Sequence, residues 1–389
     1  SAARLYRAAG KHDALLNGAP LPTLLYFALP IILGNIFQQL YSIVDAIVVG
    51  KFLGDLPLAG ISVAAPIVDV ANALVIGGTI GVGVLCAQLC GAEDWGRLRG
   101  MNATALLGGA VLTLAIAALG IGCSMPLLRA QGTEEAVCRE AAVYLRIVFA
   151  GLLCCFLYNY YAAMLRSCGN SRTPFLILLL SSTLHALLDV LFVGVFGWGI
   201  RGVAFSTVLC QALAAAACIL YAQRRCPPLL LRPANLRFDR QMARLVLSYA
   251  WAAALQQAVV CIGRLLVQGM LTPLGTSTVT GYNMSLRTEQ FLFCFSQGIS
   301  AAMVVCLSQN LGHGDRPRAR RFFRISVLVE LALIALLGTV CFLFPARIVG
   351  LFSDNADVIA AGAQYTGAMA YLYVFAYLGE VIQGFFRGL

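Results

Sequence analysis

Acidic side chains that lie inside long apolar stretches are the residues of this sequence best suited to chemistry. There are six: Asp45, Asp69, Asp189, Glu289, Glu330 and Glu380. Burying an isolated carboxylate away from water is costly, so each requires a partner, a wet cavity or a bound proton. A carboxyl group under such constraints is a candidate for taking up and releasing a proton. A structural carboxylate that is hydrogen-bonded to polar neighbours is the alternative, and it is the favoured one for Asp69.

A histidine accompanies one of these acids. His185 precedes Asp189 by four residues, which places both on one face of a helix. The imidazole can share or relay a proton with the carboxylate. The alternative is a histidine satisfied by packing and a single hydrogen bond.

Polar residues recur at helical spacing ahead of the first acid. Asn35, Gln38, Ser42 and Asp45 fall on one face of a helix. We predict that this face lines a cavity, in preference to holding two helices together. The candidates for the cavity lining are Asn35, Gln38, Gln39, Tyr41, Ser42 and Asp69.

The composition defines the class of protein. Only 11% of the 389 residues are charged and 60% are hydrophobic, with a mean hydropathy of +0.84, whereas about 25% of an ordinary globular chain is charged. So few charges cannot cover a water-soluble surface, and the chain is therefore predicted to cross a membrane repeatedly. The net charge of +10 is then explained by loops at an anionic membrane surface, and a nucleic-acid partner is excluded.

The 14 cysteines and three histidines show no ligand spacing. No C-x-x-C pair occurs, and most cysteines lie inside apolar runs. We therefore expect no disulfide framework, no metal site and no cofactor, with cysteine serving as a small packing residue.

Ten stretches are long and apolar enough to be membrane-spanning helices, for which about 20 residues are needed. They cover about residues 23–50, 58–89, 102–124, 138–165, 174–194, 202–223, 245–271, 277–309, 323–344 and 358–386. With the N-terminus in the cytoplasm, 19 Lys and Arg residues fall on that side and five on the other. This bias predicts a cytoplasmic N-terminus.

The sequence repeats itself at an offset of 221 residues. Gln88, Gly91 and Asp94 coincide with Gln309, Gly312 and Asp315. Six spans precede the basic segment 224–244, so the repeats are parallel and related by an axis along the membrane normal. We predict an all-α polytopic membrane protein of two pseudo-symmetric six-helix bundles: an N-terminal lobe at 1–223, a linker at 224–244 and a C-terminal lobe at 245–389. By this repeat the second lobe is truncated to four helices here, and about 55 further residues are expected after Leu389.

The second lobe has its own polar candidates, Arg264, Arg287, Glu289 and Glu380. An Arg264–Glu289 pair would neutralise both charges, and a structural clamp is the favoured interpretation. Glu380 lies seven residues before Arg387 on the same helix face, which predicts a gate or a structural pair. Pro30 and Pro66 lie inside predicted spans, where they act either as hinges or as static kinks.

Motifs along the chain resemble those of the MATE (multidrug and toxic compound extrusion) family. They are Leu29-Pro30, Gln38-Gln39, Val44-Asp45, Leu53-Gly54, Pro66, Ala87-Gln88-Leu89-Cys90-Gly91, Leu165-Arg166-Ser167-Cys168-Gly169, Leu188-Asp189, Arg287-x-Glu289, Ser308-Gln309-Asn310-Leu311-Gly312 and Phe386-Arg387-Gly388. The resemblance implies an antiporter that exports amphipathic, often cationic, organic compounds in exchange for H⁺ or Na⁺ by alternating access.

The resemblance also implies a coupling site. In the DinF-like branch an Asp in span 1 and an Asp in span 5 couple the ion, and Asp45 and Asp189 match these positions. His185 stands where that branch usually has Asn. The acids of the NorM-like branch look absent, since Val259 and Ala376 stand near those positions. We predict that the Asp45 and Asp189 carboxyls lie within about 8 Å, close enough for direct or single-water coupling.

Two other classes of function are alternatives to an antiporter. A flippase for lipids or lipid-linked oligosaccharides, in the same superfamily, would require a basic cavity to which Arg264 and Arg287 could contribute. An intramembrane enzyme is disfavoured, because no H-E-x-x-H, G-x-S-x-G or P-loop motif occurs. The expected partners are the lipid bilayer and small organic substrates. We expect a monomer in the bacterial plasma membrane, with no nucleic acid bound.

Overall fold

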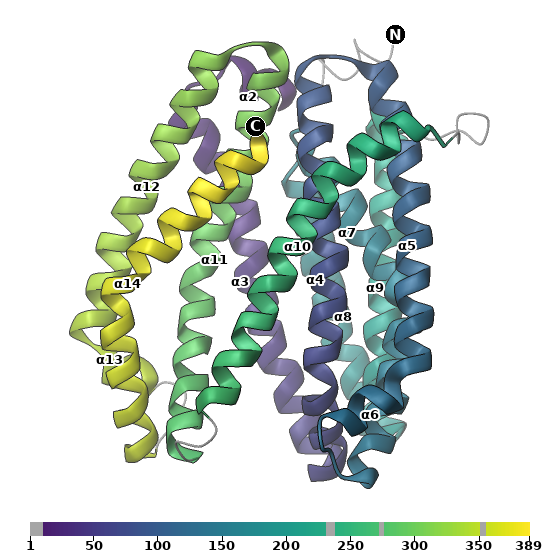
Figure 1. Cartoon of the computed structure of the whole chain (residues 1–389), viewed down its shortest axis with the longest axis vertical. Coiled ribbons are helices and arrows are strands. Elements are labelled where there is room, and N and C mark those ends of the chain that lie inside the picture. The colour runs from purple at the N-terminus through teal and green to yellow at the C-terminus, as the bar shows by residue number, and fades with distance from the viewer. Residues whose placement is uncertain (1–10, 231–237, 272–275, 351–354) are drawn as a thin grey trace.

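The computed structural model describes residues 11–230, 238–271, 276–350 and 355–389, and these are helical almost throughout (Figure 1). No strand occurs within those ranges. Eight of the described helices are long and apolar enough to cross a membrane, and the number rises to ten when each of two bent helix pairs counts as one span. The predicted all-α fold with ten spans is confirmed.

The helices follow one another with short turns between them. They are α2 (Lys11–Asn17), α3 (Pro20–Leu53), α4 (Asp55–Gly91), α5 (Trp95–Ala130), α6 (Glu135–Ala150), α7 (Leu152–Ser167), α8 (Arg172–Asp189), the π-helix η1 (Val190–Val195), α9 (Gly199–Arg225), the 3₁₀ turn η2 (Pro227–Leu229), α10 (Arg240–Leu271), α11 (Thr276–His313), α12 (Arg316–Leu343), α13 (Pro345–Val349) and α14 (Ala356–Gly388). The predicted lobe boundaries at 223 and 244 stay a prediction.

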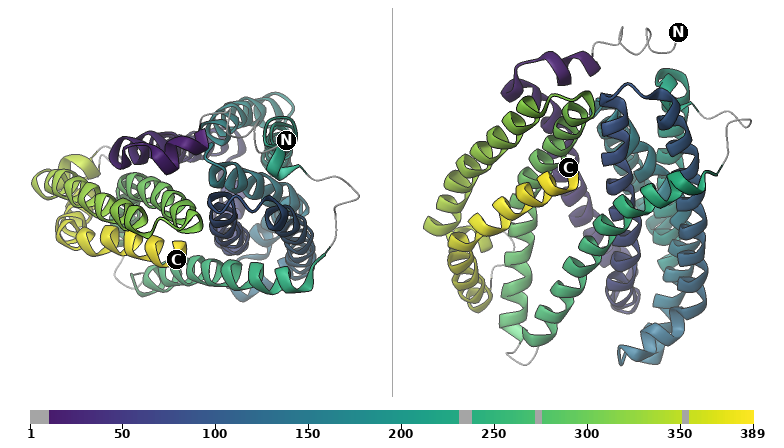
Figure 2. Two further views of the ribbon diagram at one scale, coloured as in Figure 1. Left: turned by 90° about the horizontal axis from the view of Figure 1, so that it is seen from above. Right: turned by 45° about the horizontal axis from the view of Figure 1, so that its top comes forward.

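Two groups of helices stand side by side, with α3 and α10 running between them (Figures 1 and 2). Helices α4–α9 form one bundle and α11–α14 form the other. Helix α10 packs along α4, and α3 packs along α11 as well as α8. The first span of each repeat therefore lies against the second span of the other repeat.

The contacts obey the 221-residue offset found in the sequence. Gln88 Nε2 donates a hydrogen bond to the Gly388 carbonyl at 3.1 Å, and Gln309 Nε2 donates to the Ser167 carbonyl at 2.6 Å. Both members of the second pair are the repeat equivalents of the first. Likewise Asp94 and Asp315 cap α5 and α12 through the same backbone amide position, that of Arg97 and Arg318. The pseudo-symmetry is therefore found in the hydrogen bonds of the structure as well as in the amino-acid sequence.

Glycines allow α4 and α11 to approach each other at one end of the molecule. A Cβ on Gly91 would overlap the Gln309 carbonyl, and a Cβ on Gly312 would overlap the Gln88 carbonyl. This end carries the α4–α5 and α11–α12 turns and Leu389, and it lies at the top of Figure 1. It is called the basic end below because Arg97, Arg99, Arg316 and Arg320 lie at the starts of α5 and α12, directly after those turns.

Two spans are broken, and neither break is at a predicted hinge. Helices α6 and α7 meet at 46° around Gly151, and α14 bends by 56° between Ala370 and Leu372. Pro30 and Pro66 lie inside α3 and α4, which run through them as single helices. A hinge role for either proline stays a prediction.

We predict that Gly91→Ala and Gly312→Ala separate the bundles at the basic end. The added methyl group has no room, and overpacking of this kind costs about 1–3 kcal/mol. Distances between spin labels on unnatural residues at positions 97 and 320 should lengthen in both variants. Gly100→Ala is the control, because a Cβ there meets nothing within 4 Å. Unchanged label distances in Gly91→Ala would show that the contact does not hold the bundles together.

Candidate functional site

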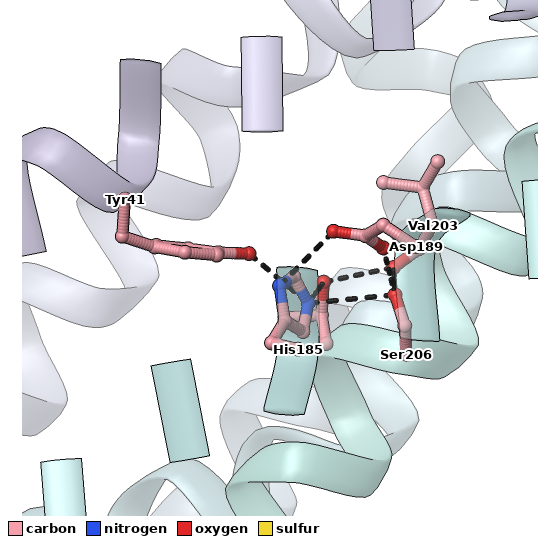
Figure 3. A network of polar contacts seen from close by, with 6 residues as sticks. Tyr41, His185, Asp189, Val203 and Ser206 are labelled. Atoms are coloured by element: carbon pink, nitrogen blue, oxygen red, sulfur yellow. Dashed lines mark hydrogen bonds and ion pairs between the residues drawn. The ribbon is translucent and has the colours of Figure 1, made fainter. Parts of the chain in front are cut away.

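A buried acid and histidine meet in the first bundle, where α8 gives way to η1 (Figure 3). His185 Nδ1 lies 3.1 Å from Asp189 Oδ2. Asp189 is completely buried and His185 is 5% exposed. The predicted pairing of these residues across one helical turn is confirmed. The π-helical turns that begin directly after Asp189 are rare in proteins and are often found at functional sites.

Helix α9 completes the surroundings of this pair. Ser206 donates its hydroxyl to Asp189 Oδ1, and Thr207 Oγ1 lies 2.9 Å from His185 Nε2. Each hydroxyl is also 2.8 Å from the Val203 carbonyl. Because each hydroxyl has one proton and at least two acceptors, the direction of these hydrogen bonds can change without movement of a heavy atom.

Tyr41 connects the pair to α3. Its hydroxyl lies 3.3 Å from His185 Nε2, and the two rings meet edge to face with centroids 4.9 Å apart. Figure 3 shows Tyr41 reaching from α3 toward the imidazole. The four residues Tyr41, His185, Asp189 and Ser206, together with Thr207, are called the His–Asp network below.

The predicted partner Asp45 lies four residues after Tyr41 in α3. Its side chain falls outside the described residues, so the predicted carboxyl separation stays a prediction. The same holds for Arg264 in α10, and hence for the proposed Arg264–Glu289 clamp.

A cavity of about 390 Å³ with a mixed polar and apolar lining lies between the two bundles. The helices that line it are α3, α4, α7, α8, α10, α11 and α14, so both repeats contribute. Of the predicted lining residues, Asn35 and Gln38 line this cavity. The contacts of Gln88, Gly91, Gln309 and Gly312 close the bundles together at the basic end.

The other predicted lining residues lie elsewhere. Tyr41 faces His185, whereas Gln39, Ser42 and Asp69 are not among the lining residues. Among the described side chains of α3, the lining stripe runs from Gln38 through Asn35 back to Ile31, toward the basic end. Helical periodicity identified the face of α3 correctly, but it carries no information about where along the helix a cavity ends.

The second bundle places one predicted pair in the cavity wall. Arg387 Nη2 lies 3.0 Å from Glu380 Oε1, and both side chains line the cavity. This confirms the expected pairing along one helix face. Arg287 is exposed and Glu289 is half-buried, and neither is a lining residue.

Sequence reasoning missed two parts of the site region. Ser206 and Thr207 are ordinary helix residues by sequence, and only the packing of α9 on α8 reveals them. Arg166 was noted for a motif but also lines the cavity. Glu330, one of the six acids named from the sequence, is fully buried beside Ser296 in the second bundle.

Comparison with known proteins identifies the family. The MatE family model matches residues 30–191 and 252–389, more than half of the chain and once in each repeat. The chain belongs to the MatE family. Members of this family are transporters, so the MatE chain described here is a membrane transport protein and not an enzyme.

Relatives of this MatE protein cover nearly all of its length. It is 28% identical to the probable multidrug resistance protein YpnP of Bacillus subtilis, over 95% of this chain and 83% of that protein. It is 26% identical to the FAD transporter of Shewanella oneidensis, over 88% of this chain and 77% of that protein. A MOP superfamily transporter from Pyrococcus furiosus has the same fold, with 20% identity, a TM-score of 0.90 and coverage of 97% and 84% of the two chains.

We predict that the Glu380–Arg387 pair is energetically coupled. Arg387→Met strands a carboxylate that is only 18% exposed, and Glu380→Gln strands a guanidinium that is 17% exposed. Each single change should lower the free energy of unfolding by about 1–3 kcal/mol, whereas the double variant should lose less than the sum of the two. Thermal unfolding in detergent measures all four proteins. Additive losses would mean that the pair contributes nothing.

Proposed function

We propose that this protein is a proton-coupled antiporter that exports amphipathic organic compounds by alternating access. The observation that carries the proposal is the buried His–Asp network, which joins a titratable pair to α3, the helix that also lines the cavity. Tyr41 contacts His185, and Gln38, three residues earlier on α3, faces the cavity.

The chemistry of the network favours a proton over a metal cation. The Asp189 carboxylate has His185 Nδ1 at one oxygen and the Ser206 hydroxyl at the other. Hard cations prefer several oxygen ligands, and an imidazole nitrogen is a poor substitute. A proton requires only a change in hydroxyl direction: when Thr207 donates to Val203, its oxygen can accept from a protonated Nε2.

Coupling follows if the two protonation states favour different positions of α3. A neutral Nε2 accepts a hydrogen bond from Tyr41, whereas a protonated Nε2 donates one. An ion can drive a conformational change only through a difference in affinity between the two states. We therefore assign α3 as the element that transmits protonation to the cavity, and separation of Gly91 from Gly312 as the opening of the basic end.

The cavity charge bears on the cargo. Arg166, Glu380 and Arg387 line the cavity, and Glu380 already pairs with Arg387. The two arginines and one glutamate leave an excess of positive charge, which favours cargo with an anionic group as a second candidate beside the cationic drugs implied by the family resemblance. One relative is named an FAD transporter. A flippase also requires a basic cavity and stays the alternative, although Arg287, one of the two arginines that suggested it, is not among the lining residues.

The membrane setting belongs to the same proposal. We place the protein in the bacterial plasma membrane as a monomer with the basic end in the cytoplasm. The 19 to five bias of Lys and Arg supports this orientation.

We predict that His185→Asn, Asp189→Asn and Asp45→Asn each reduce pH-gradient-driven efflux at least tenfold in proteoliposomes. Each removes a titratable group while keeping the side chain polar and similar in size. Dye efflux should be measured with a cationic and an anionic amphipath. Asp357→Asn, an exposed acid at the start of α14, is the control and should pump at the parental rate.

A sodium gradient imposed at constant pH distinguishes the ions. The parent protein should not respond to it. Efflux driven by sodium alone, or parental pumping by the Asn variants, would disprove the proton-coupled mechanism.

A further inference from the structure

Four buried cysteines converge at the basic end of the first bundle. Cys86 and Cys90 lie one turn apart near the end of α4, Cys168 caps the end of α7 and Cys226 caps the end of α9. Their exposed fractions are 0%, 0%, 3% and 5%. They come from three helices and lie up to 140 residues apart in the chain, which is why no sequence motif announces them.

The sulfur atoms are close enough to share one ion. The Sγ atoms of Cys86, Cys90 and Cys168 all lie within 4.8 Å of one another, and Cys90 and Cys168 are 3.4 Å apart. The Cys226 thiol adjoins that of Cys168, but it lies outside this group of three. A tetrahedral zinc site with Zn–S bonds of about 2.3 Å has sulfur atoms about 3.8 Å apart. Three of the sulfur atoms therefore already have about the spacing of a thiolate site, and Cys226 must move toward Cys86 and Cys90 to complete it.

Three helix ends surround the cluster. Helix α4 ends at Gly91, α7 at Ser167 and α9 at Arg225. Three helix C-termini thus converge on the sulfur atoms, and each carries about half a negative charge on its last carbonyl groups. These ends oppose thiolates, and four thiolates with one Zn²⁺ still have a net negative charge, so the thiols stay protonated at this position unless a cation binds.

We propose that Cys86, Cys90, Cys168 and Cys226 bind one soft d¹⁰ metal ion of the Zn²⁺ type. Thiolate ligands select this class of ion over hard cations. On binding, each sulfur forms a bond to the metal and releases its proton to the solvent, with no change of oxidation state. This assignment differs from the expectation of no metal drawn from cysteine spacing, and it is independent of the proton-coupled transport proposed above.

The site would fasten α4, α7 and α9 beside the contact that closes the bundles. Gln309 donates to the carbonyl of Ser167, the residue before Cys168, and Gly91 directly follows Cys90. A metal here would therefore fix the first-bundle side of the contact at the basic end.

The test uses the full chain purified in detergent, with affinity tags removed. Zn²⁺ alone is the first probe, quantified by elemental analysis and by proton release in weak buffer. Co²⁺ is the second, because a tetrahedral thiolate site gives sulfur-to-metal charge-transfer and intense visible bands. We expect one Zn²⁺ per chain, proton release on binding, and a melting temperature that rises with Zn²⁺ and falls with chelator.

Variants assign the ligands. Cys90→Ser and Cys168→Ser should each weaken Zn²⁺ binding at least tenfold and remove the Co²⁺ charge-transfer band. The matched controls are Cys218→Ser, a fully buried thiol on α9, and Cys306→Ser, a fully buried thiol in the second bundle. Both controls should bind as the parent does.

Three results would overturn the assignment. They are substoichiometric Zn²⁺ on the folded parent, equal binding by the Cys90→Ser and Cys218→Ser proteins, or the loss of two hydrogens by mass with no metal bound, which indicates a Cys90–Cys168 disulfide. The first does not depend on any variant folding. Because none of these measurements uses transport, failure here leaves the efflux mechanism to its own test.

Discussion

The close crossing of α4 and α11 is the contact on which the arrangement of the two bundles depends. Gly91 lies against the Gln309 backbone and Gly312 against the Gln88 backbone, while the two glutamine side chains reach the carbonyls of Gly388 and Ser167. Pseudo-symmetry makes these contacts in pairs, so they form together and break together. Packed interfaces of this kind switch between discrete states and do not deform continuously. If the proposed opening of the basic end occurs, these paired contacts must therefore be lost together.

Helix α3 contacts both bundles. It packs against α11 of the second bundle and against α8 of the first. Its residues Asn35 and Gln38 line the cavity, and Tyr41, one turn later, contacts His185. The His–Asp network in the first bundle and the cavity are thus joined by about two turns of one helix.

Periodic and repeated features were predictable, and convergent ones were not. Long apolar runs gave the spans, i,i+4 spacing gave the His185–Asp189 pair, and the 221-residue offset gave the equivalence of Gln88 with Gln309. The spans and the His185–Asp189 pair each depend on the sequence of a single helix, and the offset depends on a comparison of two segments of the sequence. Ser206, Thr207, Arg166 and the four-cysteine cluster depend on which helices pack together, and local spacing carries no such information. The predicted cavity lining also extended further along α3, to Ser42, than the observed lining does, for the same reason.

The two broken spans have a mechanical consequence. Leu372 occupies the repeat position of Gly151, and both spans bend there, so glycine is not the cause of the bend. Gly151 is instead needed because a Cβ would overlap Val208. The bend interrupts the backbone hydrogen-bond ladder, so the two halves of each broken span can change their mutual angle more easily than the halves of α3 and α4, which are continuous over 34 and 37 residues.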